Sequence, residues 1–169
     1  YILTDVQYND TICSDNTNGG ASMVKIFDGH ADIWNDVVKK RAHGEKQVIA
    51  RYHLEKFQKG GIWSGIFVVW VDTPFNKPEE CFWNVISAMK DELAENPEQL
   101  RVVRTYEDFH LAEINNQFPI LLGIEGFDGF SADIAVLETM YELGFRHASL
   151  TWNVANAFGT GAKGSHDSG

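Results

Sequence analysis

The chain has 169 residues, 44% of them hydrophobic and 12% aromatic, which fits one globular domain with a sizeable core and excludes a largely disordered chain. Its formal net charge of −10 argues against a nucleic-acid partner, because proteins that bind phosphate backbones gather Lys and Arg on one face. The two cysteines, Cys13 and Cys81, support neither a disulfide framework nor a Cys-based zinc site, and we expect a reducing, cytoplasmic setting.

The first segment, residues 1–22, is polar and rich in Asn, Asp, Thr and Gly, and it ends just before Met23. We interpret it as a tag, leader or disordered linker, and residues 23–169 as the folded domain. The segment lacks the basic-then-apolar pattern of a signal peptide, and the sequence has no apolar run of 18 or more residues. We therefore predict that the protein neither spans nor enters a membrane.

The folded domain opens with apolar runs that alternate with helical stretches. Residues 24–29 predict a short strand that leads to His30. Residues 60–71 (GGIWSGIFVVWV) predict a second strand, covered on both faces because its apolar residues do not alternate with polar ones. An amphipathic helix is predicted from Pro78 to just before Asn96, since apolar residues recur there at helical spacing. These residues are Phe82, Val85, Ile86, Met89 and Leu93.

The second half of the chain repeats this alternation. Thr105 and Asp108 resemble a capping box that opens a short helix through about Asn115. A third buried strand, a helix with an apolar face and a fourth strand are then predicted at residues 119–125, 134–143 and 147–153. This order is typical of β/α units around a parallel sheet. Because four units cannot close an eight-stranded barrel, we expect the chain to be truncated.

The segment Asp28-Gly29-His30-Ala31-Asp32 ends the first predicted strand. Residues two apart on an extended backbone point the same way, so His30 and Asp32 can present an imidazole nitrogen and a carboxylate to one metal ion. Such a mixed site suits zinc and related divalent ions. An ordinary pair of loop residues is the alternative.

Glu125 directly follows the apolar run of the third strand, where a parallel strand that opens into a loop displays catalytic groups. A carboxylate at this place can bridge two metal ions that are about 3.5–4 Å apart. The spacing alone leaves open whether Glu125 is such a bridge or begins a solvated loop.

Four segments, in this order, resemble the landmarks of the membrane (renal) dipeptidase family, the zinc dipeptidases of peptidase family M19 in the amidohydrolase superfamily. The segments are DGHAD, HLEKFQKGGIWSGIFVVWVDTP, PILLGIEG and LETMYELGFRHASLTWNVAN. The resemblance covers about residues 25–169, the N-terminal portion of such a protein, and the ordered set is far more specific than any one segment.

The resemblance implies a (β/α)8 TIM barrel, of which this chain supplies roughly the first four β/α units, with two Zn²⁺ ions in each complete active site. It implies that His30 and Asp32 bind one ion, that Glu125 bridges both, and that a water between the ions attacks the peptide carbonyl. The remaining ligands, two histidines, are expected beyond Gly169, together with an Arg for the substrate carboxylate and a late Asp. The isolated chain is therefore expected to be inactive.

One position departs from the renal pattern. Trp152 stands where the renal enzyme is expected to place a His that contacts the substrate, which is more like the bacterial members. Trp152 offers no imidazole, so Asn153 and Asn156 are expected to supply polar contacts, and these three are the predicted substrate-binding residues. Phe127 and Asp128 also differ from the Gly and His found in other members at the rim of the pocket.

Several other features are given ordinary roles. Residues 159–164 match G-x-G-x-x-G but lie in a late loop, so no dinucleotide site is expected. Trp63, Trp70 and Trp83 are expected in the core. Five histidines without ligand spacing are expected to be surface or packing residues: His43, His53, His110, His147 and His166.

The leading hypothesis is a zinc-dependent hydrolase with a dipeptide as its partner, and a homodimer is left open. One alternative is another amidohydrolase that acts on N-acyl amino acids or cyclic amides. The other is a non-catalytic protein on a degenerate barrel.

Overall fold

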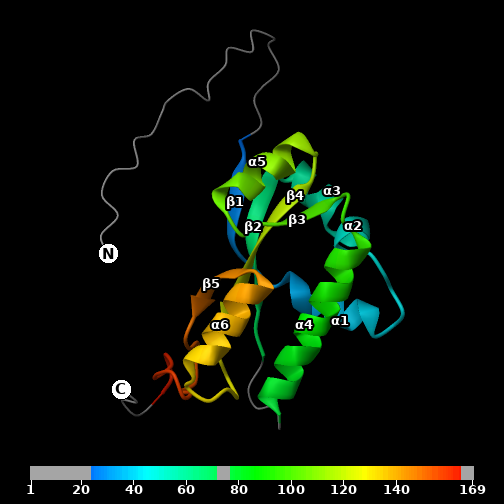
Figure 1. The fold of residues 1–169 in the computed structure, drawn as a ribbon. Coiled ribbons are helices and arrows are strands. Elements are labelled where there is room, and N and C mark those ends of the chain that lie inside the picture. The colour runs from blue at the N-terminus through cyan, green and yellow to red at the C-terminus, as the bar shows by residue number, and fades with distance from the viewer. Residues whose placement is uncertain (1–23, 72–76, 165–169) are drawn as a thin grey trace, which may run out of the picture.

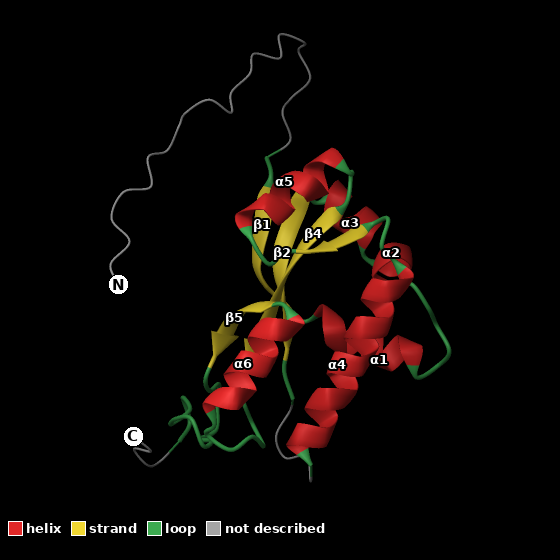
Figure 2. Ribbon diagram, in the orientation of Figure 1, coloured by secondary structure: helices red, strands yellow, loops and turns green. Residues whose placement is uncertain are grey.

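Parallel strands alternate with helices in the computed structural model, which describes residues 24–71 and 77–164 (Figures 1 and 2). The elements in chain order are β1 (Ile26–Ala31), α1 (Ile33–Arg41), α2 (Val48–Tyr52), α3 (Leu54–Lys59), β2 (Ile62–Val69), α4 (Pro78–Glu95), β3 (Leu100–Val102), α5 (Tyr106–Ile114), β4 (Phe118–Glu125), α6 (Ile134–Leu143) and β5 (Phe145–Ser149). All strand pairs are parallel, so the predicted α/β class with a parallel sheet is confirmed.

β4 lies at the centre of the sheet. Residues 120–124 of β4 pair with residues 65–69 of β2, while β3 pairs with the start of β4 and β5 with its end. Some of the β4 residues that pair with β3 and β5 also pair with β2. β3 and β5 must therefore lie along the edge of β4 opposite β2. β1 pairs with the other edge of β2, which leaves β1, β3 and β5 each with one unpaired edge within the described residues.

Alternate residues of the central strands point to opposite faces of the sheet. Phe67 and Val69 of β2, and Ile124 of β4, belong to the hydrophobic core that the helices cover. Their neighbours Val68 and Gly123, which are paired in register, therefore point to the other face. Glu125 follows the same alternation, so its carboxylate lies on the face away from the helix-covered core.

Helix α1 is anchored to the sheet and to α4. The indole N–H of the fully buried Trp34 donates to the carbonyl of Phe67 at 3.1 Å. The fully buried carboxylate of Glu92 on α4 accepts the backbone N–H of Ile49 at 2.8 Å and an Arg41 N–H at 3.3 Å. A buried carboxylate is stable only when it is paired and hydrogen-bonded in this way. The cluster fixes α1 and, with it, the residue at its N-terminus.

The sequence analysis missed one strand and misplaced another. β3 was not predicted, because three residues are too few to show a periodic pattern. The predicted fourth strand at residues 147–153 is wrong at both ends, since β5 begins at Phe145 and ends at Ser149. The chain beyond β5 folds back on itself instead, with the carbonyls of Trp152 and Asn153 accepting backbone N–H groups of Ala162 and Lys163, each at 2.7 Å.

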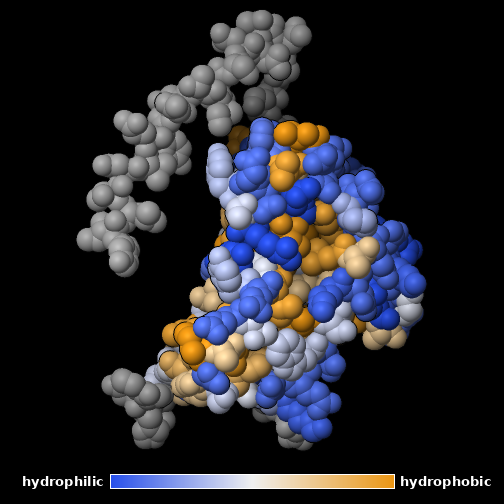
Figure 3. Space-filling view, viewed as in Figure 1, coloured by the Kyte–Doolittle hydropathy of each residue, from blue (hydrophilic) through white to orange (hydrophobic). Residues whose placement is uncertain are grey.

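Three helices, α4, α5 and α6, follow the predicted patterns, whereas α1, α2 and α3 were not predicted. Asp108 accepts the backbone N–H of Thr105 at 2.9 Å, which confirms the predicted capping box of α5. None of the three tryptophans predicted in the core belongs to it: Trp83 is 38% exposed, and Trp63 and Trp70 are half-buried and line cavities. Apolar residues also remain exposed around β5 and α6 (Figure 3), among them Ile134 at 68% and Leu150 at 49%.

Some expectations fall outside what the structure describes. The interpretation of residues 1–22 and the role of His166 lie beyond the described ranges. Within those ranges, none of the helices combines the length and the hydropathy needed to span a bilayer.

Candidate metal centre

Three side chains with metal-binding atoms meet at the carboxyl ends of the strands. His30 Nε2 lies 3.3 Å from Glu125 Oε2 and 3.6 Å from Asp32 Oδ1. One ligand atom from each of the three lies within 4.8 Å of the other two, and we call this group the donor triad. β2 separates β1 from β4 in the sheet, so only the folded chain brings His30 and Glu125 together.

The spacing of the donor triad fits a small divalent cation. Zinc binds His nitrogen and carboxylate oxygen at about 2.0–2.2 Å in a tetrahedral arrangement, which sets neighbouring ligand atoms about 3.4 Å apart. The observed separations of 3.3 and 3.6 Å match that value. The side chains of His30 and Asp32 are 45% and 57% exposed and that of Glu125 only 17%, so the triad opens to solvent on the β1 side.

The local backbone presents these groups differently from the extended geometry that the sequence predicts. His30 lies in β1, and its backbone N–H donates to Asp28 Oδ1 at 3.0 Å. Asp32 is the N-cap of α1, with φ −82° and ψ 38°, so it is not extended. The two side chains still converge, because the chain turns from strand into helix between them.

The end of β4 is held against the loop after β5. The backbone N–H of Gly126 donates to the carbonyl of Ser149, the last residue of β5, at 3.0 Å, and that of Phe127 donates to the carbonyl of Leu150 at 3.2 Å. Gly126 has φ +81°, a left-handed conformation that lets the chain turn away directly after Glu125. Glu125 is therefore fixed at the mouth of the sheet.

The three predicted substrate-binding residues lie in the loop after β5. Trp152 is 51% exposed, and its ring centroid lies 6.2 Å from that of Trp70. Asn156 donates to the carbonyl of Leu150 at 2.8 Å and accepts the N–H of Phe158 at 2.9 Å, so its amide holds the loop together. Asn153 is half-buried.

Asp128 is a rim residue to which the sequence pattern assigned no role. Its Oδ2 would lie 2.8 Å from a Cβ added at Gly126, so the carboxylate folds back toward the end of β4. Burial raises the pKa of Asp128, and a side-chain hydrogen bond with Asn156 offsets part of that rise. The sequence shows that Asp128 differs from the residue found in other members, but it does not show that the carboxylate turns back toward Gly126.

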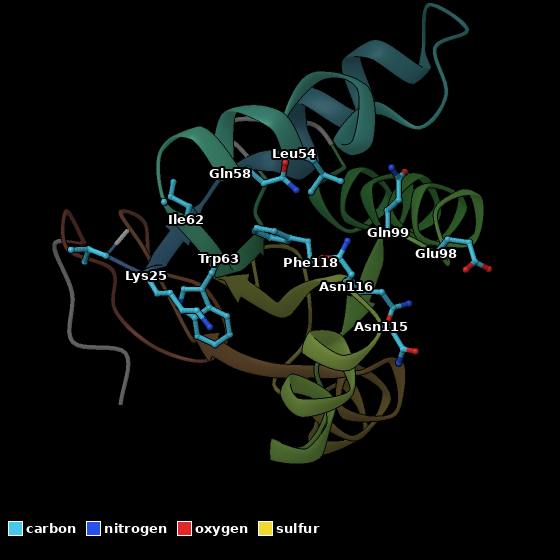
Figure 4. Close-up of a pocket in the computed structure, with 13 residues that line it drawn as sticks. Lys25, Leu54, Gln58, Ile62, Trp63, Glu98, Gln99, Asn115, Asn116 and Phe118 are labelled. Atoms are coloured by element: carbon cyan, nitrogen blue, oxygen red, sulfur yellow. The ribbon is translucent and has the colours of Figure 1, made fainter. Parts of the chain in front are cut away.

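Two cavities of about 580 Å³ lie at opposite ends of the strands. The first lies at their amino-terminal ends and shares no residue with the donor triad (Figure 4). Apolar residues such as Trp63 and Phe118 line it together with amides such as Gln58 and Gln99. The second includes Asp32 of the triad, and parallel α/β folds place their chemistry at this carboxyl end.

The other histidines stand apart from the triad. His53 Nε2 lies 2.8 Å from Asp36 Oδ2, and His43 Nδ1 lies 2.8 Å from the carbonyl of Lys39. His147 lies on β5 in register with Gly123, and its buried Nδ1 has no hydrogen-bond partner among the described residues.

Comparison with known proteins gives a family match over most of the chain. The family described as "Membrane dipeptidase (Peptidase family M19)" matches residues 21–168. Among curated proteins, an uncharacterised protein in the pqqA 5′ region of Klebsiella pneumoniae is 28% identical over 88 residues, which are 52% of this chain and 32% of that protein.

Solved structures of similar proteins share the fold. A metallopeptidase of family M19 described as dipeptidase AC is 17% identical, with a TM-score of 0.65 over 78% of this chain and 45% of that one. A metallopeptidase from Rhodobacter sphaeroides, solved with a phosphinate mimic of the dipeptide L-Ala-D-Ala, is 16% identical, with a TM-score of 0.65 over 78% and 46%. An amidohydrolase from Pseudomonas aeruginosa is 26% identical, with a TM-score of 0.58 over 70% and 35%.

The expected fold is confirmed by these likenesses: the chain has an α/β fold of the TIM-barrel type and supplies part of a barrel. The chain spans less than half the length of the structures that it matches.

Proposed function

The chain belongs to the membrane dipeptidase family, peptidase family M19, and on that premise we propose that it supplies part of the active site of a zinc-dependent dipeptidase. The observation that carries this proposal is the convergence of His30, Asp32 and Glu125 at the carboxyl edge of the sheet. That edge is where enzymes of this fold type display their catalytic groups.

In this proposal each member of the donor triad has its own role. His30 and Asp32 hold one cation, because their donor atoms are 3.6 Å apart and face the solvent-exposed side. Glu125 has two carboxylate oxygens: one lies 3.3 Å from His30 Nε2, and the other is proposed to serve a second cation. When bound, a pair of such cations lowers the pKa of a water and polarises a carbonyl oxygen.

Zinc is the metal that we propose, since one imidazole nitrogen and two carboxylates form a mixed donor set that suits it. The ligands that complete a two-metal site are proposed to come from outside the described residues. For the 169-residue chain alone we therefore expect single-metal binding and negligible turnover.

The proposed substrate is a dipeptide held beside the triad. The Rhodobacter sphaeroides relative was solved with a dipeptide mimic, which supports this class of substrate. Trp152, half exposed beside the end of β4, and Asn153 are proposed to contact the dipeptide. Asn156 is proposed to position that loop, because its amide is already hydrogen-bonded within it. The cytoplasmic setting and the homodimer stay predictions.

A second candidate function is hydrolysis of an N-acyl amino acid or a cyclic amide. The likeness to the Pseudomonas aeruginosa amidohydrolase supports this second candidate. Hydrolysis rates of the full-length protein on dipeptides, N-acyl amino acids and cyclic amides separate the two candidates.

Metal binding is the first test of the proposal. Calorimetric titration with Zn²⁺ is expected to show tight binding that falls by at least about tenfold in His30→Ala and Glu125→Gln. The first variant removes a ligand nitrogen, and the second replaces a charged carboxylate by a neutral amide with a single oxygen. His43→Ala is the matched control, since His43 lies outside the triad. Equal zinc affinity in all four proteins would contradict the proposed site.

Hydrolysis is the second test. The full-length protein is expected to lose dipeptide hydrolysis when a chelator removes its metal, and to regain it when Zn²⁺ is added. Full activity in a metal-free preparation would contradict the proposed function.

A further inference from the structure

Two tryptophans meet at the carboxyl end of β4. Trp70 follows the last residue of β2, and Trp152 lies in the loop after β5. Because β4 lies between β2 and β5 in the sheet, a contact between these two rings must cross the end of β4. The ring centroids are 6.2 Å apart with planes tilted by 58°, so the pair closes over the strand that ends at Glu125.

Both tryptophans lie beside the end of β4, the strand that ends at Glu125. The last register pair of β2 and β4 is Val69 with Ile124, so Trp70 stands one step further along, beside Glu125. Trp70 also lines the same cavity as Asp32. The backbone nitrogen of Trp152 lies 3.8 Å from the place of a Cβ at Gly126, the residue after Glu125.

The pair is held by apolar packing. The indole N–H of Trp70 is buried and has no acceptor among the described residues, so no hydrogen bond explains the position of this ring. Trp152 is 51% exposed, and Leu150 and Val154, on either side of it in the loop, are 49% and 38% exposed. An apolar surface of this kind faces water unless something apolar covers it.

Polar and apolar groups both surround the triad. The cavity that contains Asp32 is lined by polar groups of α1, including Asn35 and Lys39, and by apolar residues that include Val85 and Trp70. Across the end of β4, the indoles of Trp70 and Trp152 form an apolar wall.

We propose that this tryptophan wall determines specificity, by packing against a bulky apolar side chain of the dipeptide held at the donor triad. The inference rests on the proposed function and names its substrate class: dipeptides with large apolar residues. Each additional methylene in an apolar pocket is worth about 10–200-fold in discrimination. Leu-Leu is therefore expected to be preferred over Ala-Ala by at least about tenfold.

The test uses the full-length protein loaded with Zn²⁺ and two readouts. The first is kcat/KM for Leu-Leu and for Ala-Ala. The second is calorimetric binding of phosphinate analogues of the same two dipeptides, which are not hydrolysed. Trp152→Ala is expected to reduce both Leu-to-Ala ratios to near one by weakening Leu-Leu alone, while Trp152→Phe keeps most of the preference. Trp70→Ala is expected to act in the same direction.

Tyr106→Ala is the matched control, because Tyr106 is an aromatic residue that is 83% exposed on α5, and this variant should leave both ratios unchanged. An equal loss for Leu-Leu and Ala-Ala in Trp152→Ala would give the tryptophans a structural role only and overturn the proposal. Equal binding of the two analogues by the wild type would show that another part of the protein covers the wall, which also overturns it.

The two proposals fail in different ways. If neither dipeptide is hydrolysed but the Leu-Leu analogue binds at least about tenfold more tightly in a Trp152-dependent manner, the wall stands and the dipeptidase proposal fails. If both dipeptides are hydrolysed at similar rates, the dipeptidase proposal stands, and the proposal that the tryptophan wall determines specificity fails.

Discussion

Replacing Gly123 by Ala tests the packing directly beneath the donor triad. Gly123 lies in β4, two residues before Glu125, on the same face of the sheet. A Cβ at this position would lie 2.7 Å from Ile66 Cγ2, 3.0 Å from Val68 Cγ1 and 3.1 Å from His147 Nδ1. Three side chains from two neighbouring strands thus fill the space that the glycine leaves.

The expected cost follows from these distances. Ile66 and Val68 are β-branched residues on strands, so they cannot move aside freely, and overpacking of this kind costs about 1–3 kcal/mol. Replacing a glycine by alanine returns up to about 1 kcal/mol by restricting the unfolded chain. We therefore expect a net loss of about 1–2 kcal/mol in the free energy of unfolding. A shift of β4 also moves Glu125, so zinc affinity is expected to fall by about tenfold.

Urea unfolding followed by circular dichroism measures the first effect, and calorimetric titration with Zn²⁺ the second. Gly29→Ala is the control, since a Cβ there has no neighbour within 4 Å. Ile66→Ala should restore part of the stability of Gly123→Ala, because it removes the nearest clashing methyl. If Gly123→Ala is as stable as Gly29→Ala, or gains nothing from Ile66→Ala, the packing argument is refuted.

Three further predictions concern charge and metal. Arg41→Met leaves the fully buried Glu92 without its cation, and urea unfolding should show a loss of about 3–5 kcal/mol that Glu92→Leu partly restores in the double variant. Burial alone would raise the pKa of Asp36, but hydrogen bonds from Lys40 and His53 lower it below the usual value. Asp36 thus adds stability above about pH 4 that is lost as the pH falls through its lowered pKa, and Asp36→Asn should flatten the fall in Tm between about pH 6 and pH 3. Zn²⁺ at about 100 times its Kd should raise the free energy of unfolding by about 2.7 kcal/mol, but not in a variant without the triad histidine.

Each of these predictions has a clear contrary result. An Arg41→Met variant as stable as the wild type would mean that Glu92 is satisfied without its cation. An equal acid-induced fall in Tm with and without Asp36→Asn would remove that carboxylate from the acid response. Equal stabilisation by Zn²⁺ with and without the triad histidine would place the metal elsewhere.

The sequence alone determined the class of fold and singled out the residues of the candidate metal centre. The buried strand at residues 119–125 and the amphipathic helix from Pro78 can be recognised from the spacing of apolar residues along the sequence. This is possible because burial on one face or both is a local property of each element. The segment DGHAD and the Glu after PILLGI can also be recognised locally, since a carboxylate directly after an apolar strand is visible in the sequence without knowledge of its neighbours in space.

Only the tertiary structure decided which of these groups meet. His30 and Glu125 lie on strands that β2 separates, so their 3.3 Å approach depends on the pairing and curvature of the whole sheet. Asp32 joins them from a helix N-terminus that a buried charge cluster holds in place, and not from the extended backbone that its spacing predicted. Trp70 and Trp152 meet because the chain turns back after Ser149, and hydrogen bonds to distant backbone groups, which no local period encodes, determine that turn.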